Sequence, residues 1–350
     1  MPTPVTDEDR SFLVQSFMKL SNAQVRDFLR SKGLPVSGSK SELQERIETG
    51  LEDGDITDED LVNVLDGVLP WWKFHAYLYS GPRTVHAEWR TEAAARQHLA
   101  TKGLDGLMDA SIPLYLPDDL TLSSIDYVEN RSVRIIAIQR REYTAREQDL
   151  DVEEESEDGE TILYRAWVER IARVMVIFEW QLRAKEAMLQ ITELPSGVTY
   201  EEVRDDFIEL IAEWLDFSRF TVLKVKKAIA KLHELEEAGT PEARSHGIEY
   251  ETDQGRRLSG RSSTASESVL GEAVIDDSLR QMRGTGNGRK GNFYWPPTLG
   301  TNDGEVSLGK EVHTIVLAPD NRVNLKTRTF TDNTEAEMRH VLSRLRTHSK

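Results

Sequence analysis

The stretch GLPVSGSKSELQERI, residues 33–47, constrains the fold of this chain more than any other. Gly33 suits the left-handed position that ends a helix, and Pro35 prevents that helix from continuing. Ser39 with Glu42 three residues later forms a capping box, which predicts that a second helix begins there. The pattern therefore predicts two short helices joined by a tight loop.

A small apolar core is predicted between these two helices. The first helix is expected to start at Ser21, which forms another capping box with Gln24. In both helices apolar residues recur at helical spacing, namely Val25, Phe28, Leu29, Leu43 and Ile47. The segment therefore reads as a compact helix–loop–helix unit.

Residues 19–50 resemble a SAP motif, the short DNA-binding helix–extended loop–helix of many chromatin, repair and nuclease proteins. The matching positions are Val25, Phe28, Leu29, Gly33-Leu34, Gly38-Ser39-Lys40, Leu43 and Arg46-Ile47. The resemblance implies DNA as the partner, with double-stranded DNA favoured and the contacts largely independent of base sequence. It implies nothing directly about the remaining residues.

The N-terminus of the second helix is the predicted contact point. Unpaired backbone N–H groups and the positive end of the helix dipole attract anions there. Lys40 would meet a phosphate as a point charge, and further cations come from the first helix and the loop. The candidate DNA-binding residues are Arg26, Arg30, Lys32, Gly38, Ser39, Lys40, Ser41 and Arg46.

The charge distribution predicts a local contact. The chain has a net charge of −17, whereas residues 19–50 carry six basic and four acidic side chains. Phosphate contacts need lysine and arginine, so a protein that coats nucleic acid along its length is usually basic. The overall acidity is also explained by solubility or by adaptation to salt. A SAP motif that docks a protein, or binds RNA, remains an alternative.

The composition predicts an intracellular protein. The chain has 350 residues, 38% of them hydrophobic, and no cysteine, which suits a reducing compartment. We see neither an apolar run long enough to cross a membrane nor a signal peptide. The expected location is cytoplasmic and nucleoid-associated in a prokaryote, or nuclear in a eukaryote.

The fold class is predicted as α+β. A helical N-terminal region, residues 1–69, is followed by an antiparallel-sheet α+β domain, residues 70–350, with long flexible loops. The second region alternates strand-like and helical patterns: strands with a turn near 183–186, a hairpin after 311 and a C-terminal helix. The helix after Asp58 is expected to end before Pro70.

Two biased segments are interpreted as loops. Residues 147–160 hold nine acidic side chains among fourteen residues and predict a solvated loop, with DNA mimicry as an alternative. Residues 240–304 are rich in Gly, Ser and Arg. A second nucleic-acid contact is predicted within that segment, where basic groups precede aromatic rings. Its candidates are Arg280, Arg283, Arg289, Lys290, Tyr294 and Trp295.

No catalytic residue, metal ligand or cofactor is identified. The eight histidines form no metal-like pair, and GNGRKG at 286–291 is followed by residues that cannot open a helix. We therefore interpret the chain as a non-catalytic DNA-binding protein whose larger domain binds a protein partner or self-associates. Two alternatives stay open: a metal-dependent nuclease or other DNA-processing enzyme with unrecognised carboxylates, and a protein-interaction scaffold.

Overall fold

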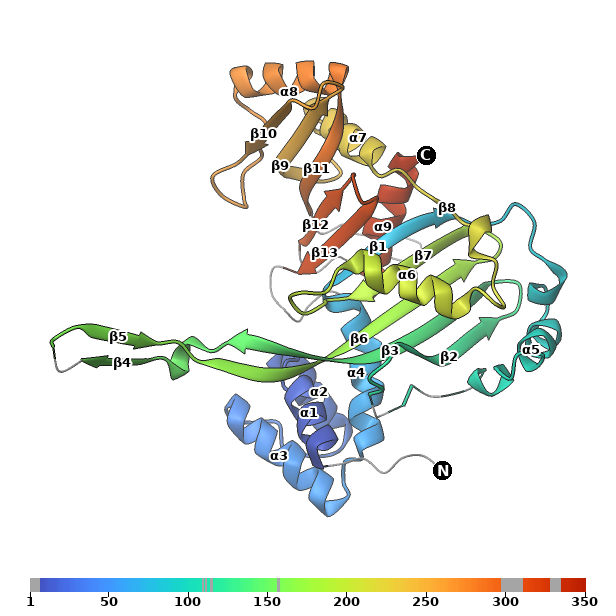
Figure 1. Ribbon diagram of the computed structural model, residues 1–350, viewed down its shortest axis with the longest axis vertical. Coiled ribbons are helices and arrows are strands. Elements are labelled where there is room, and N and C mark those ends of the chain that lie inside the picture. Colours follow the sequence, from blue (N-terminus) through green and yellow to red (C-terminus); the bar gives the residue numbers. More distant parts are fainter. Residues whose placement is uncertain are drawn as a thin grey trace.

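The computed structural model describes residues 7–108, 110, 112–113, 116–155, 158–296, 311–327 and 335–350. An N-terminal group of helices lies against a large antiparallel sheet, and a long two-stranded arm projects from one side of that sheet (Figure 1). The fold is α+β, as predicted. All pairings between the described strands are antiparallel.

The N-terminal helices form their own core. They are α1 (Asp7–Phe17), α2 (Asn22–Ser31), α3 (Lys40–Asp53) and α4 (Asp58–Trp72). The predicted capping boxes are confirmed, with Ser21 at the start of α2 and Ser39 at the start of α3. Buried side chains from all four helices meet in this core, among them Phe17, Val25, Leu29, Leu43, Ile47, Leu61 and Leu65.

Helix α4 continues into the sheet domain. It runs through Pro70, so the prediction that the helix ends before this proline is wrong. Pro70 lies in the last turn of α4, and only Trp71 and Trp72 follow it in the helix. Leu65 packs in the N-terminal core, whereas Trp71 packs in a core of the sheet. The helix thus crosses the expected boundary at 69/70 and belongs to both regions.

Among the described residues, the main sheet has eleven strands, in the order β10-β9-β11-β12-β13-β1-β7-β6-β3-β2, with β8 paired to β1. Their bounds are β1 (Phe74–Ser80), β2 (Thr121–Val128), β3 (Ser132–Arg146), β6 (Trp167–Gln181), β7 (Glu186–Thr192), β8 (Thr221–Val222), β9 (Arg244–Thr252), β10 (Arg257–Arg261), β11 (Gly286–Trp295), β12 (Val312–Leu317) and β13 (Arg322–Thr327). The predicted turn between β6 and β7 and the predicted hairpin β12–β13 are both confirmed.

Helices cover the two halves of the sheet and bury two cores. On the β9–β13 half these are α7 (Lys226–Glu237), α8 (Ala273–Thr285) and the predicted C-terminal helix α9 (Glu335–Ser349). The other half is covered by α5 (Glu92–Ala100) and α6 (Tyr200–Ile211). Short 3-10 turns complete the connections: η1 (Ala87–Trp89), η2 (Asp105–Leu107), η3 (Gln148–Leu150) and η4 (Phe217–Arg219).

The arm is made by the far ends of β3 and β6, which stay paired from Ser132↔Gln181 to Arg146↔Trp167. Beyond them β4 (Val152–Glu155) pairs with β5 (Thr161–Tyr164). The described residues of the acidic segment 147–160 therefore include a strand, where the sequence predicted a loop. Ion pairs of arm arginines with Glu147 and Asp151 hold the segment in place. The arm exposes apolar side chains: Leu150, Val152, Ile162, Leu163, Tyr164 and Trp167.

The Gly/Ser/Arg-rich segment is also more regular than expected. Residues 244–252, 257–261 and 286–295 are strands, and 273–285 form a helix. Gly288 serves close packing, since a Cβ at this position would lie 2.9 Å from Cγ2 of Ile229 on α7. Residues 240–296 are thus part of the sheet domain. The remainder of the predicted segment, 297–304, lies outside the described residues.

Candidate nucleic-acid interface

The loop between α2 and α3 is held by two arginines of the predicted site. The Arg46 guanidinium donates to the carbonyls of Pro35, at 3.3 Å, and Ser37. From the other side, the Arg26 guanidinium donates to the Gly38 carbonyl at 3.1 Å. Both residues were predicted as DNA contacts, yet in this structure their side chains position the loop. Arg46 and Arg26 therefore shape the site and add positive charge behind it.

The N-terminus of α3 presents hydrogen-bond donors. Ser39 Oγ accepts from the Glu42 amide, and the Glu42 carboxylate accepts from the Ser39 amide at 2.6 Å. This hydrogen bond to the Ser39 backbone is the main cause that lowers the pKa of Glu42. Within the described part of the chain, the amides of Lys40 and Ser41 have no backbone acceptor. These two N–H groups can bind an oxyanion, while the Ser41 hydroxyl is hydrogen-bonded to Ser39 Oγ at 3.0 Å.

The lysines and the remaining arginine of the site differ in their surroundings. Lys32 pairs with Asp60 of α4 at 2.6 Å, so a structural partner already neutralises it. Arg30 pairs on the surface with Asp27. Lys40 is exposed, and no described carboxylate lies within ion-pair distance of it. Of the predicted cations, Lys40 is the one best placed to meet a phosphate.

Gly38 is required for the geometry of the loop. Its φ is +121°, and a Cβ built on it would lie 2.8 Å from Oε2 of Glu42. We expect Gly38→Ala to strain the backbone and displace the Glu42 carboxylate from its capping position. The free energy of unfolding should fall by roughly 1–3 kcal/mol, which urea denaturation followed by circular dichroism will measure.

Gly33→Ala is the matched control for that variant. Gly33 has φ +73°, but nothing lies within 4 Å of a Cβ at this position. Only the left-handed backbone cost of roughly 1 kcal/mol should therefore appear. If both alanine variants lose the same stability, the contact with Glu42 has no energetic importance.

The second predicted contact does not form an open basic and aromatic loop. Trp295 is buried and donates to Thr314 at 2.9 Å, and Tyr294 is stacked on His313. The arginines are used in ion pairs between elements, which are Arg280–Glu237, Arg283–Glu237, Arg289–Glu249 and Arg289–Glu251, and Arg280 also pairs with Asp277 within α8. Lys290 lies on the same strand, β11, and is exposed, whereas the two rings are buried. The stacking role proposed for Tyr294 and Trp295 is therefore corrected, because their rings are already packed.

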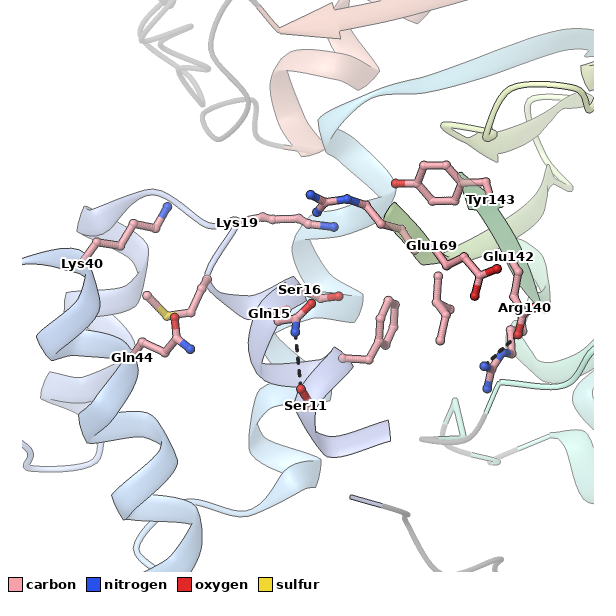
Figure 2. Close-up of a pocket in the computed structure, with 14 residues that line it drawn as sticks. Ser11, Gln15, Ser16, Lys19, Lys40, Gln44, Arg140, Glu142, Tyr143 and Glu169 are labelled. Carbon is pink, nitrogen blue, oxygen red and sulfur yellow. Dashed lines mark hydrogen bonds and ion pairs between the residues drawn. The ribbon is translucent and has the colours of Figure 1, made fainter. Parts of the chain in front are cut away.

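A cleft beside Lys40 is lined by basic residues that were not predicted from the sequence to belong to a site. It has a volume of about 650 Å³ and lies between α1 and α3 on one side and the base of the arm on the other. Figure 2 shows Lys40 and Gln44 of α3 across the cleft from Arg140 and Tyr143 of β3, with Lys19 between them. No sequence signal identified this cleft, because its walls come from two segments far apart in the sequence, residues 11–44 and 140–171.

The described ranges contain no group of three or more histidine, aspartate or glutamate side chains that could hold a metal ion. None of their helices is both long and apolar enough to cross a membrane.

Comparison with known proteins bears on one part of the chain. A search of curated proteins found no match. One family model matches the segment that contains the loop held by Arg26 and Arg46, the Ser39 cap and the exposed Lys40. It is the model of the SAP domain, it matches residues 16–49, and the match indicates nucleic-acid binding.

Proposed function

We propose that this protein is a non-catalytic DNA-binding protein that holds the phosphate backbone of double-stranded DNA at the N-terminus of α3. The observation that carries the proposal is the exposed Lys40 beside two amides without backbone acceptors, inside a segment that matches the SAP domain. Contacts of this kind are to phosphate, so they are largely independent of base sequence.

The rest of the structure supports a positioning role for the larger domain. The SAP segment packs on α4, which continues into the sheet, so a bound duplex would be held close to the base of the arm. The binding site has few cations, and a single site of this size should bind weakly and lose affinity as salt rises. The sheet domain, with the exposed apolar side chains on its arm, is the proposed surface for a protein partner or for self-association.

Lys40→Glu is expected to weaken binding of a fluorescent duplex by about tenfold or more, because it replaces a phosphate contact by repulsion. The slope of log affinity against log salt should also become shallower by about 1. Fluorescence anisotropy across a salt series measures both quantities.

Lys102→Glu is the matched control, since Lys102 is also exposed but lies just after α5, away from the SAP segment. It changes the net charge of the chain by the same amount as Lys40→Glu. Equal losses in the two variants would show that overall charge, and not the α3 N-terminus, governs the affinity. A wild-type protein that binds no duplex in low salt would contradict the proposed function itself.

A further inference from the structure

The cleft beside Lys40 continues into a second hollow of about 830 Å³. The two share five lining residues: Phe12, Ser16, Lys19, Tyr143 and Ile171. Helix α1 and the turn after it form one wall, and the base of the arm forms the other. Each hollow falls in the size range of ordinary ligand pockets. We name the two together the arm-base cleft.

Basic side chains outnumber acidic ones along this cleft. Seven basic residues line it: Lys19, Lys40, Lys73, Arg140, Arg146, Arg170 and Arg173; the acidic ones are Glu142, Glu169 and Glu193. A cleft of this sign is unusual in a chain with a net charge of −17. Focusing of a positive potential between low-dielectric walls attracts an anionic ligand.

Two lysines of the cleft have no acidic neighbour within ion-pair distance among the described residues. The arginines and Lys73 pair with carboxylates, as in Arg170–Glu147, Arg140–Glu142 and Lys73–Glu193. No such pair involves Lys19 or Lys40. Burial and then the nearby Arg170 guanidinium lower the pKa of Lys19, against the opposing charge of Glu193. Lys19 and Lys40 are therefore the lysines of the cleft that are placed to pair with a phosphate group.

The same cleft has one exposed ring, two half-buried rings and apolar walls. Trp167, the first residue of β6 on the arm, leaves 62% of its surface exposed. It lines the larger hollow together with Tyr143 and Phe12. Base–aromatic stacking needs a ring face of this kind beside a cationic track for the backbone, and it tolerates any base.

We propose that the arm-base cleft binds a single-stranded segment of nucleic acid, with phosphates at Lys19 and Lys40 and a base stacked on Trp167. This proposal rests on the proposed function, because Lys40 joins the two surfaces. The cleft proposal adds a second class of ligand to the proposed function: a strand end, a gap or an unpaired stretch next to the duplex held at α3.

The test uses the full chain with a labelled dT oligonucleotide, a labelled duplex and a duplex with a single-stranded tail, each measured by anisotropy in low salt. Lys19→Glu and Trp167→Ala should each weaken binding of the oligonucleotide about fivefold or more, with little effect on the blunt duplex. Lys40→Glu should weaken binding of all three ligands.

Tyr164→Ala is the matched control for Trp167→Ala, because Tyr164 is a half-exposed ring on the arm that does not line the cleft. Urea denaturation of each variant separates lost binding from lost folding. If Lys40→Glu weakens duplex binding while Lys19→Glu and Trp167→Ala behave as wild type with the oligonucleotide, the cleft proposal is wrong and the proposed function stands. If the two cleft variants instead abolish self-association in sedimentation velocity, the cleft receives the acidic arm of a second copy.

Discussion

Asp66→Ala is expected to lower the free energy of unfolding by about 3–5 kcal/mol, because it leaves a buried guanidinium without its counter-charge. Asp66 of α4 pairs with Arg173 of β6 at 3.1 Å, and their side chains are only 14% and 6% exposed. Burial raises the pKa of Asp66, with Arg173 acting in the opposite direction, and burial also lowers the pKa of Arg173. The low exposure of both side chains places the pair where water has little access.

The double variant Asp66→Leu/Arg173→Met tests the cause of that loss. Apolar residues in place of a buried ion pair often cost little or even stabilise. We therefore expect the double variant to unfold at a urea concentration much closer to that of the wild type than either single variant. If the double variant is as unstable as Asp66→Ala plus Arg173→Met, the two side chains act independently, and the unpaired charge is not the source of the cost.

Acidification from pH 7 to pH 5 is expected to lower the free energy of unfolding, with about 2 kcal/mol of the loss due to His233 alone. His233 is buried on α7, where its Nδ1 lies 2.9 Å from the hydroxyl of Tyr250 on β9. Burial and the Arg283 guanidinium of α8 lower the pKa of His233 to about 4, against the opposing charge of Glu237. The unfolded chain then binds this proton near pH 6.5, whereas the folded chain resists it until about pH 4.

Because the pKa of His233 is lower in the folded chain than in the unfolded chain, the free energy of unfolding falls as the pH is lowered. Above pH 6.5 the imidazole is neutral in both states, so the full stability is present. As the pH falls towards 4, the unfolded state gains protons that the folded state does not, and the stability is progressively lost. His233→Gln should flatten this slope in urea titrations at pH 7, 6 and 5. His86→Gln, at an exposed position, is the control and should keep the wild-type slope.

The helix–loop–helix could be predicted from the sequence because its signals are local. A capping box at Ser39 and glycines at 33 and 38 act within a few residues, and the structure has each of them. The roles of Arg26 and Arg46 could not be read in this way. Their guanidinium groups reach carbonyls twelve and nine residues away, which the folded loop brings to them. From the sequence alone, a basic residue in a DNA-binding motif is therefore predicted to contact DNA, even where its side chain instead holds the loop.

The sheet domain was harder to predict from the sequence because its charged residues form ion pairs between strands and its glycines allow close packing. Arg289 and Arg257 contact Glu251 across neighbouring strands, so a segment that appears too polar to be buried becomes part of a sheet. Glycine at 288 gives α7 room to approach the sheet, where composition indicated a turn. The acidic arm was obscured in the same way, since its carboxylates are held by arginines of β3 and β6.

The unbroken course of α4 has a further consequence for binding strength. Because one helix packs in both the N-terminal core and the core of the sheet, no flexible linker separates Lys40 from the base of the arm. A ligand that touches both surfaces loses its translational freedom once, and no loop has to be ordered to bring the second contact into reach. Two weak contacts then combine nearly multiplicatively in affinity, so a protein with few unpaired cations can still hold nucleic acid firmly.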